Sequence, residues 1–258
     1  MKLQAQVALI TGGGKGIGRA IARLFASEGA KVVVNGTDQT AIESVAKEIN
    51  ESGGQAIAYP ADIADEALVK QMVETTVKEF GKLDILVNNS GIAGPTAAVV
   101  DVSRDEWDRT LAINLTGAML CAKYALPNMI ERRSGTVINI TSVGGLGGYA
   151  YRSPYCASKW AMIGLSKTIA LEAGPYGITA NAIAPGPVRG PRIDAVIQKR
   201  AEAIGKSFEE VEREYTGQTA LKRMVENEDI AEMALFLASA AGRNITGEVI
   251  NISAGMRV

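Results

Sequence analysis

Short apolar runs alternate with longer amphipathic stretches along the chain. Runs such as residues 6–11 (QVALIT) and 31–35 (KVVVN) lack a regular polar position, which is typical of strands buried on both faces of a sheet. In the longer stretches apolar residues recur every three or four positions, as in residues 39–51. This period predicts helices that each bury one face.

The pattern predicts strands at 6–11, 31–35, 55–60, 83–88, 136–141, 178–184 and 248–252. Helices are expected at 17–27, 39–51, 66–80, 154–173 and 229–238, with one or two more inside 193–216. A capping-box pattern at Ser103 and Glu106 opens another, long helix that runs to about residue 132. We therefore predict an α/β fold of Rossmann type: a doubly wound parallel sheet of about seven strands in a three-layer α/β/α sandwich. Residues 1–258 are expected to form a single domain.

Composition removes several classes of function. The chain has 27 basic and 28 acidic residues, whereas nucleic-acid-binding domains usually carry a basic excess. It contains no histidine, which excludes Ser-His-Asp hydrolysis and histidine-ligated zinc, and we expect no metal. Its two cysteines, Cys121 and Cys156, are expected to be reduced thiols. No apolar run approaches the ~18 residues of a membrane span, and no segment of signal-peptide type follows Met1, so we expect a cytoplasmic protein without a membrane partner.

A glycine-rich turn follows the first predicted strand. Residues 11–18 read TGGGKGIG, and this turn leads directly into the first predicted helix. Gly12 permits a tight turn, whereas Gly16 and Gly18 would let the backbone and the helix N-terminus approach a pyrophosphate. Because the turn belongs to a strand-turn-helix-strand unit, it indicates a dinucleotide site and not only a structural turn.

Tyr155 and Lys159 lie four residues apart and share one helix face. An ordinary tyrosine, with a pKa of about 10, is a poor acid or base near neutral pH, but a nearby ammonium stabilises the phenolate. Of the seven tyrosines, Tyr155 alone has a lysine four positions on.

These motifs stand in a fixed order with several others. They are residues 11–18, Asp62-Ile63, the NNSG run at 88–91, Asn114, Ser142, the YCASK run at 155–159 and Pro185-Gly186. Together they resemble the short-chain dehydrogenase/reductase family over essentially the whole chain, including its 3-oxoacyl-carrier-protein reductase members.

The resemblance implies a catalytic role for four residues. Tyr155 would be the general acid in reduction and the base in oxidation. Ser142 would hydrogen-bond the reacting oxygen, and Lys159 would bind the nicotinamide ribose and lower the pKa of Tyr155. Asn114 would hold a water in a proton relay. Donors aimed at the oxygen on which charge develops stabilise the transition state.

The resemblance also implies a set of cofactor contacts. Asp62 and Ile63 would contact adenine, and the segment of Asn89, Ser90 and Gly91 would pass beside the adenine ribose. Ser90 stands where the family usually has alanine. The full predicted set is Gly12, Gly14, Lys15, Gly16, Ile17, Gly18, Asn35, Thr37, Asp62, Ile63, Asn89, Ser90, Gly91, Tyr155, Lys159, Pro185, Gly186 and Val188.

The choice between NADP and NAD depends on the residues after the second strand. Members that prefer NAD usually carry an acidic residue there, but this chain has Gly36 at that place. Lys15 in the glycine turn, with Asn35 and Thr37, could bind a 2′-phosphate. The sequence therefore favours NADP, with NAD as the alternative.

Three arginines mark a possible substrate mouth. Arg152 precedes Tyr155 by three residues, while Arg189 and Arg192 begin a segment, about residues 187–216, where the family carries its substrate lid. Since arginine recognises anions through its planar fork, a small polar substrate that can be anionic is our leading hypothesis. Solvated surface arginines or subunit contacts explain them equally well. A 3-oxoacyl-carrier-protein reductase is the alternative, and a non-catalytic cofactor-binding regulator is the remote one. Family members usually form homotetramers, so we expect one here.

Overall fold

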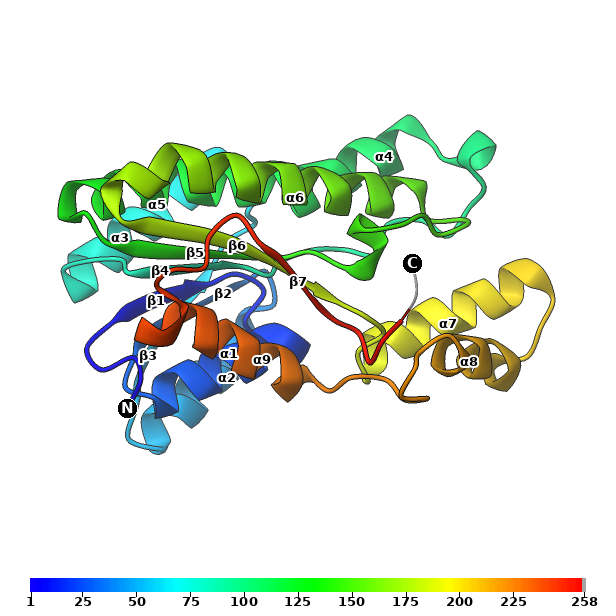
Figure 1. Ribbon diagram of the computed structural model, residues 1–258, viewed down its shortest axis with the longest axis horizontal. Helices are drawn as coiled ribbons and strands as arrows, with labels where there is room; N and C mark the ends of the chain where they lie inside the picture. The colour runs from blue at the N-terminus through cyan, green and yellow to red at the C-terminus, as the bar shows by residue number, and fades with distance from the viewer. Residues whose placement is uncertain (257–258) are drawn as a thin grey trace.

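The computed structural model describes residues 1–256. Its core is a seven-stranded sheet in the order β3-β2-β1-β4-β5-β6-β7, with every neighbouring pair parallel (Figure 1). The strands are β1 (Val7–Ile10), β2 (Lys31–Gly36), β3 (Gln55–Pro60), β4 (Ile85–Asn88), β5 (Gly135–Ile140), β6 (Ile178–Pro185) and β7 (Val249–Ile252). The predicted doubly wound parallel sheet is confirmed.

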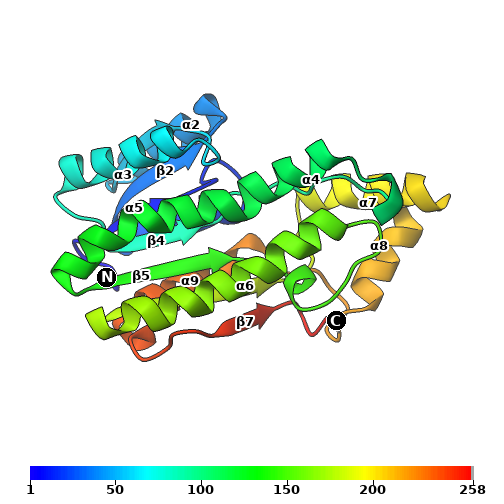
Figure 2. The ribbon, with the colours of Figure 1, turned by 90° about the horizontal axis from the view of Figure 1, so that it is seen from above.

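Helices cover both faces of this sheet. They are α1 (Gly16–Ser27), α2 (Gln39–Glu51), α3 (Glu66–Phe80), α4 (Arg104–Leu111), α5 (Gly117–Arg132), α6 (Ser153–Ala173), α7 (Pro191–Ile204), α8 (Phe208–Gly217) and α9 (Asn227–Ala238). In Figure 1, α5 and α6 lie above the sheet and α1, α2 and α9 below it. Figure 2 shows α5 and α6 running side by side across the upper face.

The apolar strands supply two separate cores because successive side chains point to opposite faces. In β1, Ala8 and Ile10 pack with α1, α2 and α9, whereas Leu9 packs on the other face with α3, α5 and α6. This double burial explains why the strands showed no polar alternation in the sequence.

The long helix predicted from Ser103 to about residue 132 is interrupted. Ser103 does cap α4, and the capping box with Glu106 is present. Residues Ala112–Thr116, however, form a π-helical turn between α4 and α5. Such turns widen the helix by one residue and occur often at functional sites.

The predicted lid is a hairpin of two helices with a small core of its own. Ile197 and Ala201 of α7 pack against Val211 of α8 and the following Met224. The helices predicted inside residues 193–216 are present, and the first of them, α7, begins slightly earlier than predicted, at Pro191. In Figure 1 this hairpin projects beyond one end of the sheet.

Candidate active site

The predicted site residues meet at one edge of the sheet. All seven strands are parallel, so their carboxyl ends lie along a single edge, and ligands of such sheets bind there. The glycine turn follows β1, Thr37 follows β2, Asp62 follows β3, and the segment from Asn89 follows β4. Ser142 follows β5 and Gly186 follows β6. The strand order reverses between β1 and β4, which places the glycine turn and Asn89 side by side.

The glycine turn is held by Asn89 and Thr11. The Asn89 amide donates to the carbonyl oxygens of Thr11 (3.0 Å) and Gly12 (3.1 Å), and the Thr11 hydroxyl accepts from the N–H groups of Asn89 and Ser90. Gly12 has φ +63°, a conformation that favours glycine. A methyl group at Gly18 would lie 2.5 Å from Asn89 Nδ2 and 2.8 Å from the Gly12 carbonyl carbon. Gly18 is therefore required by the protein's own close packing, in addition to any approach by a ligand.

The N-terminus of α1 has no partner from its own cap. Lys15 occupies the cap position, its side chain accepts no hydrogen bond from the helix N–H groups, and the first turn, which contains Ile17, carries no acidic residue. The first N–H groups of a helix lack intrahelical acceptors and carry partial positive charge. Together with the turn of Gly12, Gly14 and Gly16, this end fits the pyrophosphate of a dinucleotide.

Tyr155 and Ser142 approach each other across Gly144. A methyl group at Gly144 would lie 3.3 Å from Tyr155 Cε1 and 3.5 Å from Ser142 Oγ, so both side chains border the same small space. Ser142 Oγ accepts from the Gly144 N–H at 3.0 Å, which leaves its own hydrogen available for another acceptor. Both side chains retain a hydroxyl group that can donate to one substrate oxygen.

Lys159 lies buried behind Tyr155. Its Nζ is 5.9 Å from the centroid of the Tyr155 ring and donates to the Ile140 carbonyl oxygen at 2.8 Å. Burial, assisted by the charge of Arg192, lowers the pKa of the Lys159 ammonium to about 7. Within residues 1–256 this is its one hydrogen bond, so two N–H positions remain for a ligand.

Asn114 occupies the π-helical turn and is fully buried. Its Oδ1 accepts from the Ile92 N–H (2.7 Å), and its Nδ2 donates to the Ile92 carbonyl (3.1 Å) and to Ser158 Oγ (3.1 Å). Ser158 in turn donates to the Tyr155 carbonyl at 2.7 Å. Ser158 thus links Asn114 to the helical turn that carries Tyr155, a role that sequence reasoning missed although Ser158 stands inside the YCASK run.

Gly91 places the β4 loop between two of these side chains. A methyl group there would lie 3.1 Å from Asn114 Oδ1 and 3.6 Å from Lys159 Nζ. The four predicted catalytic residues are therefore brought together by the β4 loop, the π-helical turn, the end of β5 and the start of α6.

The Asn35 side chain forms its hydrogen bonds within the sheet. It is fully buried, and its Nδ2 donates to the carbonyl oxygens of Tyr59 and Ala61, both at 3.1 Å. Both amide hydrogens are thus used within the protein, so the structure gives no support to the predicted contact of the Asn35 side chain with a cofactor phosphate. Thr37, the next predicted contact, is exposed.

Although Gly36 stands where NAD-preferring members have an acidic residue, the carboxylate of Asp38 lies near the end of β2. Asp38 accepts from Lys15 Nζ at 2.7 Å and also caps α2 through the Ala41 N–H. The Lys15 ammonium beside it, together with the Ala41 N–H, lowers the pKa of the Asp38 carboxyl. The sequence reasoning examined Gly36 and overlooked Asp38, which lies two positions later.

The remaining predicted cofactor contacts sit on tightly packed backbone. Ile63 is buried, and a methyl group at Gly117 of α5 would lie 2.6 Å from its side chain, so α5 passes directly over it. Asp62 accepts from the Ala64 N–H at 3.0 Å. Gly186 directly follows Pro185, the last residue of β6, and its N–H donates to the Ile252 carbonyl of β7 at 2.9 Å. Val188 forms a β-bridge with Val225.

The three arginines predicted to bind substrate lie in different surroundings. Arg152 stacks on the Tyr155 ring, with its Cζ 4.9 Å from the ring centroid. Burial lowers the pKa of Arg152, and the charge of the exposed Arg192 adds to this effect, as it does at Lys159. Arg189 instead pairs with Glu226 at 3.2 Å on the surface, so its predicted substrate contact is not supported.

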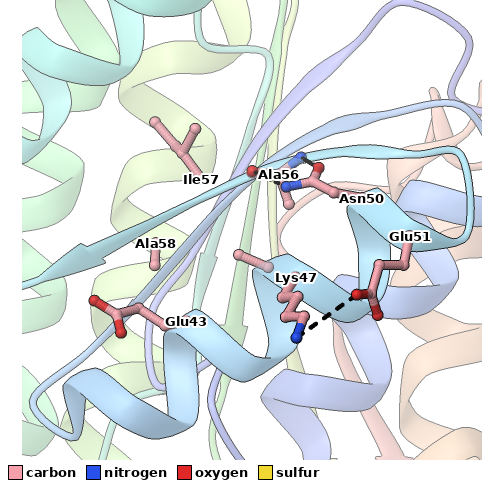
Figure 3. Close-up of a pocket in the computed structure, with 8 residues that line it drawn as sticks. Glu43, Lys47, Asn50, Glu51, Ala56, Ile57 and Ala58 are labelled. Carbon is pink, nitrogen blue, oxygen red and sulfur yellow. Dashed lines mark hydrogen bonds and ion pairs between the residues drawn. The ribbon is translucent and has the colours of Figure 1, made fainter.

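A wide, open concavity lies elsewhere. It holds about 620 Å³ and runs between α2 and the edge strand β3, and its lining includes Glu43, Lys47, Glu51, Ile57 and Ala58 (Figure 3). The Lys47–Glu51 pair spans 3.7 Å on its rim. Because β3 is the outer strand and the groove runs along its flank, this concavity is separate from the Tyr155 cluster.

In residues 1–256 no helix is long and apolar enough to cross a membrane. The same residues hold no group of three His, Cys, Asp or Glu side chains placed for a metal ion. Both cysteines are buried and unpaired, and burial raises the pKa of Cys121 to about 12.

Architecture and site together define a Rossmann-type oxidoreductase, and known proteins support this class. A family model described as "Enoyl-(Acyl carrier protein) reductase" matches residues 12–257. A 3-oxoacyl-[acyl-carrier-protein] reductase of Synechocystis sp. is 38% identical, with 98% of each chain covered. The structure of NAD+-bound xylitol dehydrogenase matches with a TM-score of 0.96 at 31% identity, covering 99% of this chain and all of the other. A levodione reductase structure matches with a TM-score of 0.93 at 33% identity, covering 98% of both. The chain belongs to the short-chain dehydrogenase/reductase family and is an enzyme that acts on CH–OH or C=O groups.

Proposed function

We propose that the protein transfers a hydride between NADP(H) and the hydroxyl or carbonyl carbon of a small polar substrate. The observation that carries this proposal is the convergence of Tyr155 and Ser142 over Gly144, with Lys159 buried behind them. The uncapped N-terminus of α1 and the packed turn of Gly12 and Gly18 fit a dinucleotide at the same edge of the sheet.

The bound nicotinamide would donate the hydride in reduction and accept it in oxidation. In reduction the Tyr155 hydroxyl donates its proton to the carbonyl oxygen as negative charge develops there. Ser142 donates a second hydrogen bond to that oxygen, because its Oγ already accepts from Gly144 and its hydrogen is thereby free to turn outward. In oxidation Tyr155 removes the hydroxyl proton instead.

Lys159 and Asn114 support Tyr155 in different ways. The Lys159 ammonium stabilises the negative phenolate that proton donation leaves behind, and its two remaining N–H positions fit the hydroxyls of a ribose. Asn114 is a positioning residue: it fixes the Ile92 backbone and, through Ser158, the first turn of α6. A water on the unused lone pair of Asn114 Oδ1 would complete a proton relay.

The Lys15–Asp38 pair bears on the choice of cofactor. Lys15 and the exposed Thr37 flank the end of β2 and would bind a 2′-phosphate, which supports NADP(H). Asp38 favours the alternative cofactor, NAD(H), because its carboxylate pairs with the Lys15 ammonium and would repel a phosphate. Dissociation constants of NADPH and NADH for the wild type, Lys15→Ala and Asp38→Asn separate the two. NADPH binding that is unchanged in Lys15→Ala would exclude the phosphate role.

Turnover tests the proposal directly. NADPH and NADH oxidation would be followed with small ketones, oxo acids and acetoacetyl thioesters, and the reverse reaction with the matching alcohols. Tyr155→Phe, which keeps the ring and loses the proton, should lower kcat by about 10²–10⁴-fold with cofactor binding retained. Undiminished turnover in this variant would remove Tyr155 from the chemistry.

A 3-oxoacyl-[acyl-carrier-protein] reductase activity is the second candidate, because the Synechocystis relative carries that name. Turnover confined to thioesters would select it. The proximity of the four predicted catalytic side chains supports an enzyme over a non-catalytic regulator.

We also propose a cytoplasmic homotetramer built through α5 and α6. Met119 and Trp160 expose 39% and 53% of their surface on these neighbouring helices, which is unusual for large apolar side chains unless a partner covers them. The mass of the protein in solution tests this assembly.

A further inference from the structure

A second, smaller cavity lies beside Tyr155. Its free volume is about 10 Å³, which is room for about one water molecule or one carboxylate oxygen and far below the roughly 300–1,000 Å³ of sites for drug-sized ligands. Its walls come from the β4 loop, the start of α6 and the lid helices α7 and α8. The lining residues are Thr96, Tyr149, Ala150, Arg152, Val196, Arg200 and Tyr215. Such a space admits at most the oxygen of a small head group and excludes a long chain.

Arg152 enters this cavity as a cation without a counter-ion. Its guanidinium lies over the Tyr155 ring, and its Nη2 donates to the Ala93 carbonyl at 2.8 Å. Its Nε and Nη1 are buried and have no hydrogen-bond partner. Across the described chain no carboxylate lies within ion-pairing distance of Arg152.

Arg200 and Thr96, on two other walls of the cavity, also have buried polar atoms without a hydrogen-bond partner. Arg200 is held by Glu214 through Nη2 at 3.5 Å, but its Nε is buried without a partner. Thr96 Oγ1 is also buried and unpartnered. An unmade hydrogen bond at a buried polar group costs about 1–3 kcal/mol, and more when the group is charged. The cavity therefore gathers donors that require an acceptor from outside the protein.

We propose that this cavity binds the carboxylate of the substrate, which makes the substrate a short hydroxy acid or oxo acid. The inference rests on the proposed hydride transfer and adds the substrate's chemical class. Arg152 and Arg200 would hold the carboxylate, and Thr96 would donate to it. Because Arg152 contacts the Tyr155 ring, the carboxylate lies only a few bonds from the carbon that reacts.

The same arrangement couples substrate to the lid. Arg152 is the N-cap residue of α6, while Arg200 belongs to α7. A carboxylate between them would join the two elements and hold the lid over the reacting carbon. Binding energy from a group remote from the reacting atoms can be used in this way to position the substrate.

Matched acids and esters test the proposal. 3-Hydroxybutyrate and its methyl ester, with 2-hydroxybutyrate and its methyl ester, would be oxidised by the wild type, Arg152→Gln, Arg200→Gln and Arg213→Gln. Arg213 is an exposed arginine of the same lid that does not line the cavity, and it serves as the control. For the wild type we expect kcat/KM for the acid to exceed that for the ester by at least about tenfold.

Arg200→Gln should raise KM for the acid by about ten- to hundredfold and should narrow the preference for acid over ester by a similar factor, because the ester has no carboxylate to lose. Arg152→Gln should do the same and also lower kcat, and Arg213→Gln should match the wild type. Equal turnover of acid and ester, or an unchanged preference in Arg200→Gln, would overturn the proposal while leaving the hydride transfer standing.

A binding measurement separates the two proposals. Calorimetric titration with malonate, an unreactive dicarboxylate, needs no turnover. If no substrate of the panel reacts, malonate binding that is lost in Arg200→Gln supports the carboxylate subsite, and equal binding by both proteins refutes it. Binding of inorganic phosphate in place of malonate would also refute the carboxylate assignment.

Discussion

Replacing Gly18 by alanine should damage both the stability of the fold and the cofactor site. Gly18 lies in the first turn of α1, beneath the turn that carries Gly12. The added methyl group would lie 2.5 Å from Asn89 Nδ2 and 2.8 Å from the Gly12 carbonyl carbon, where carbon contacts normally span about 3.5–4.0 Å. It would also meet the Gly12 carbonyl oxygen.

The overlap of about 1 Å cannot be relieved by rotating a side chain alone, because part of the obstacle is backbone. Overpacking costs about 1–3 kcal/mol, and the better helix propensity of alanine offsets about 1 kcal/mol of this. With backbone in the way we expect a net loss near 2 kcal/mol. For a chain of this size that corresponds to a fall in Tm of about 4–8 °C.

Thermal unfolding followed by circular dichroism measures the first effect. Fluorescence titration with NADPH measures the second, for which we expect a dissociation constant raised at least about tenfold, because displaced Asn89 no longer fixes the turn. Gly174→Ala is the matched control. Gly174 has φ −53° and nothing within 4 Å of an added methyl group, so this variant should be neutral or stabilised by about 0.4–1 kcal/mol. A Gly18→Ala protein with the Tm and NADPH affinity of the wild type would refute the packing argument.

Three further predictions follow from the site. Lys159 has a lowered pKa of about 7 in the folded protein but about 10.4 when unfolded, so between these values the unfolded chain binds the extra proton and stability rises with pH. Urea unfolding should show this rise, of up to about 1.4 kcal/mol per pH unit, for the wild type relative to Lys159→Met, and parallel pH curves would contradict it. Asp38→Asn should release Lys15 and strengthen NADPH binding severalfold without strengthening NADH binding, whereas equal effects on both cofactors would remove the pair from cofactor choice. Ser158→Ala should lower kcat more than it raises KM, because the first turn of α6 loses its tie to Asn114, and a normal kcat would leave Ser158 a purely structural residue.

Most of the fold could be predicted because local pattern and tertiary structure agree. The buried strands read as apolar runs, and the boundaries of α2, β3 and α3 coincide with the predicted ranges. The π-helical turn at Ala112–Thr116 could not be predicted, because the apolar period of 104–132 is compatible with a continuous helix. That turn coincides with the contacts of Asn114 to Ile92 and Ser158, which come from distant parts of the chain.

In the candidate site, too, features set by local sequence could be predicted, whereas features set by tertiary contacts could not. Tyr155 and Lys159 lie one turn apart on α6, and Arg152 is the N-cap residue three positions before Tyr155, so sequence spacing alone placed these side chains near one another. Arg200 gives no such signal, because only the tertiary structure brings α7 to a wall of the cavity that Arg152 also lines. The misplaced residues also have tertiary causes: Asn35 is drawn into the sheet by two carbonyls of the β3 end, and Arg189 is drawn outward by Glu226.

The lid hairpin has an evolutionary consequence. Its apolar contacts are largely internal, with Ile197 and Ala201 closing against Val211, whereas the sheet is stabilised by the two cores on its faces. Mutations in α7 and α8 can therefore accumulate at little thermodynamic cost to the catalytic framework. Under this arrangement a change in one hairpin can alter the substrate preference. Proteins that descend from a common ancestor can therefore differ in substrate while they keep the same catalytic residues.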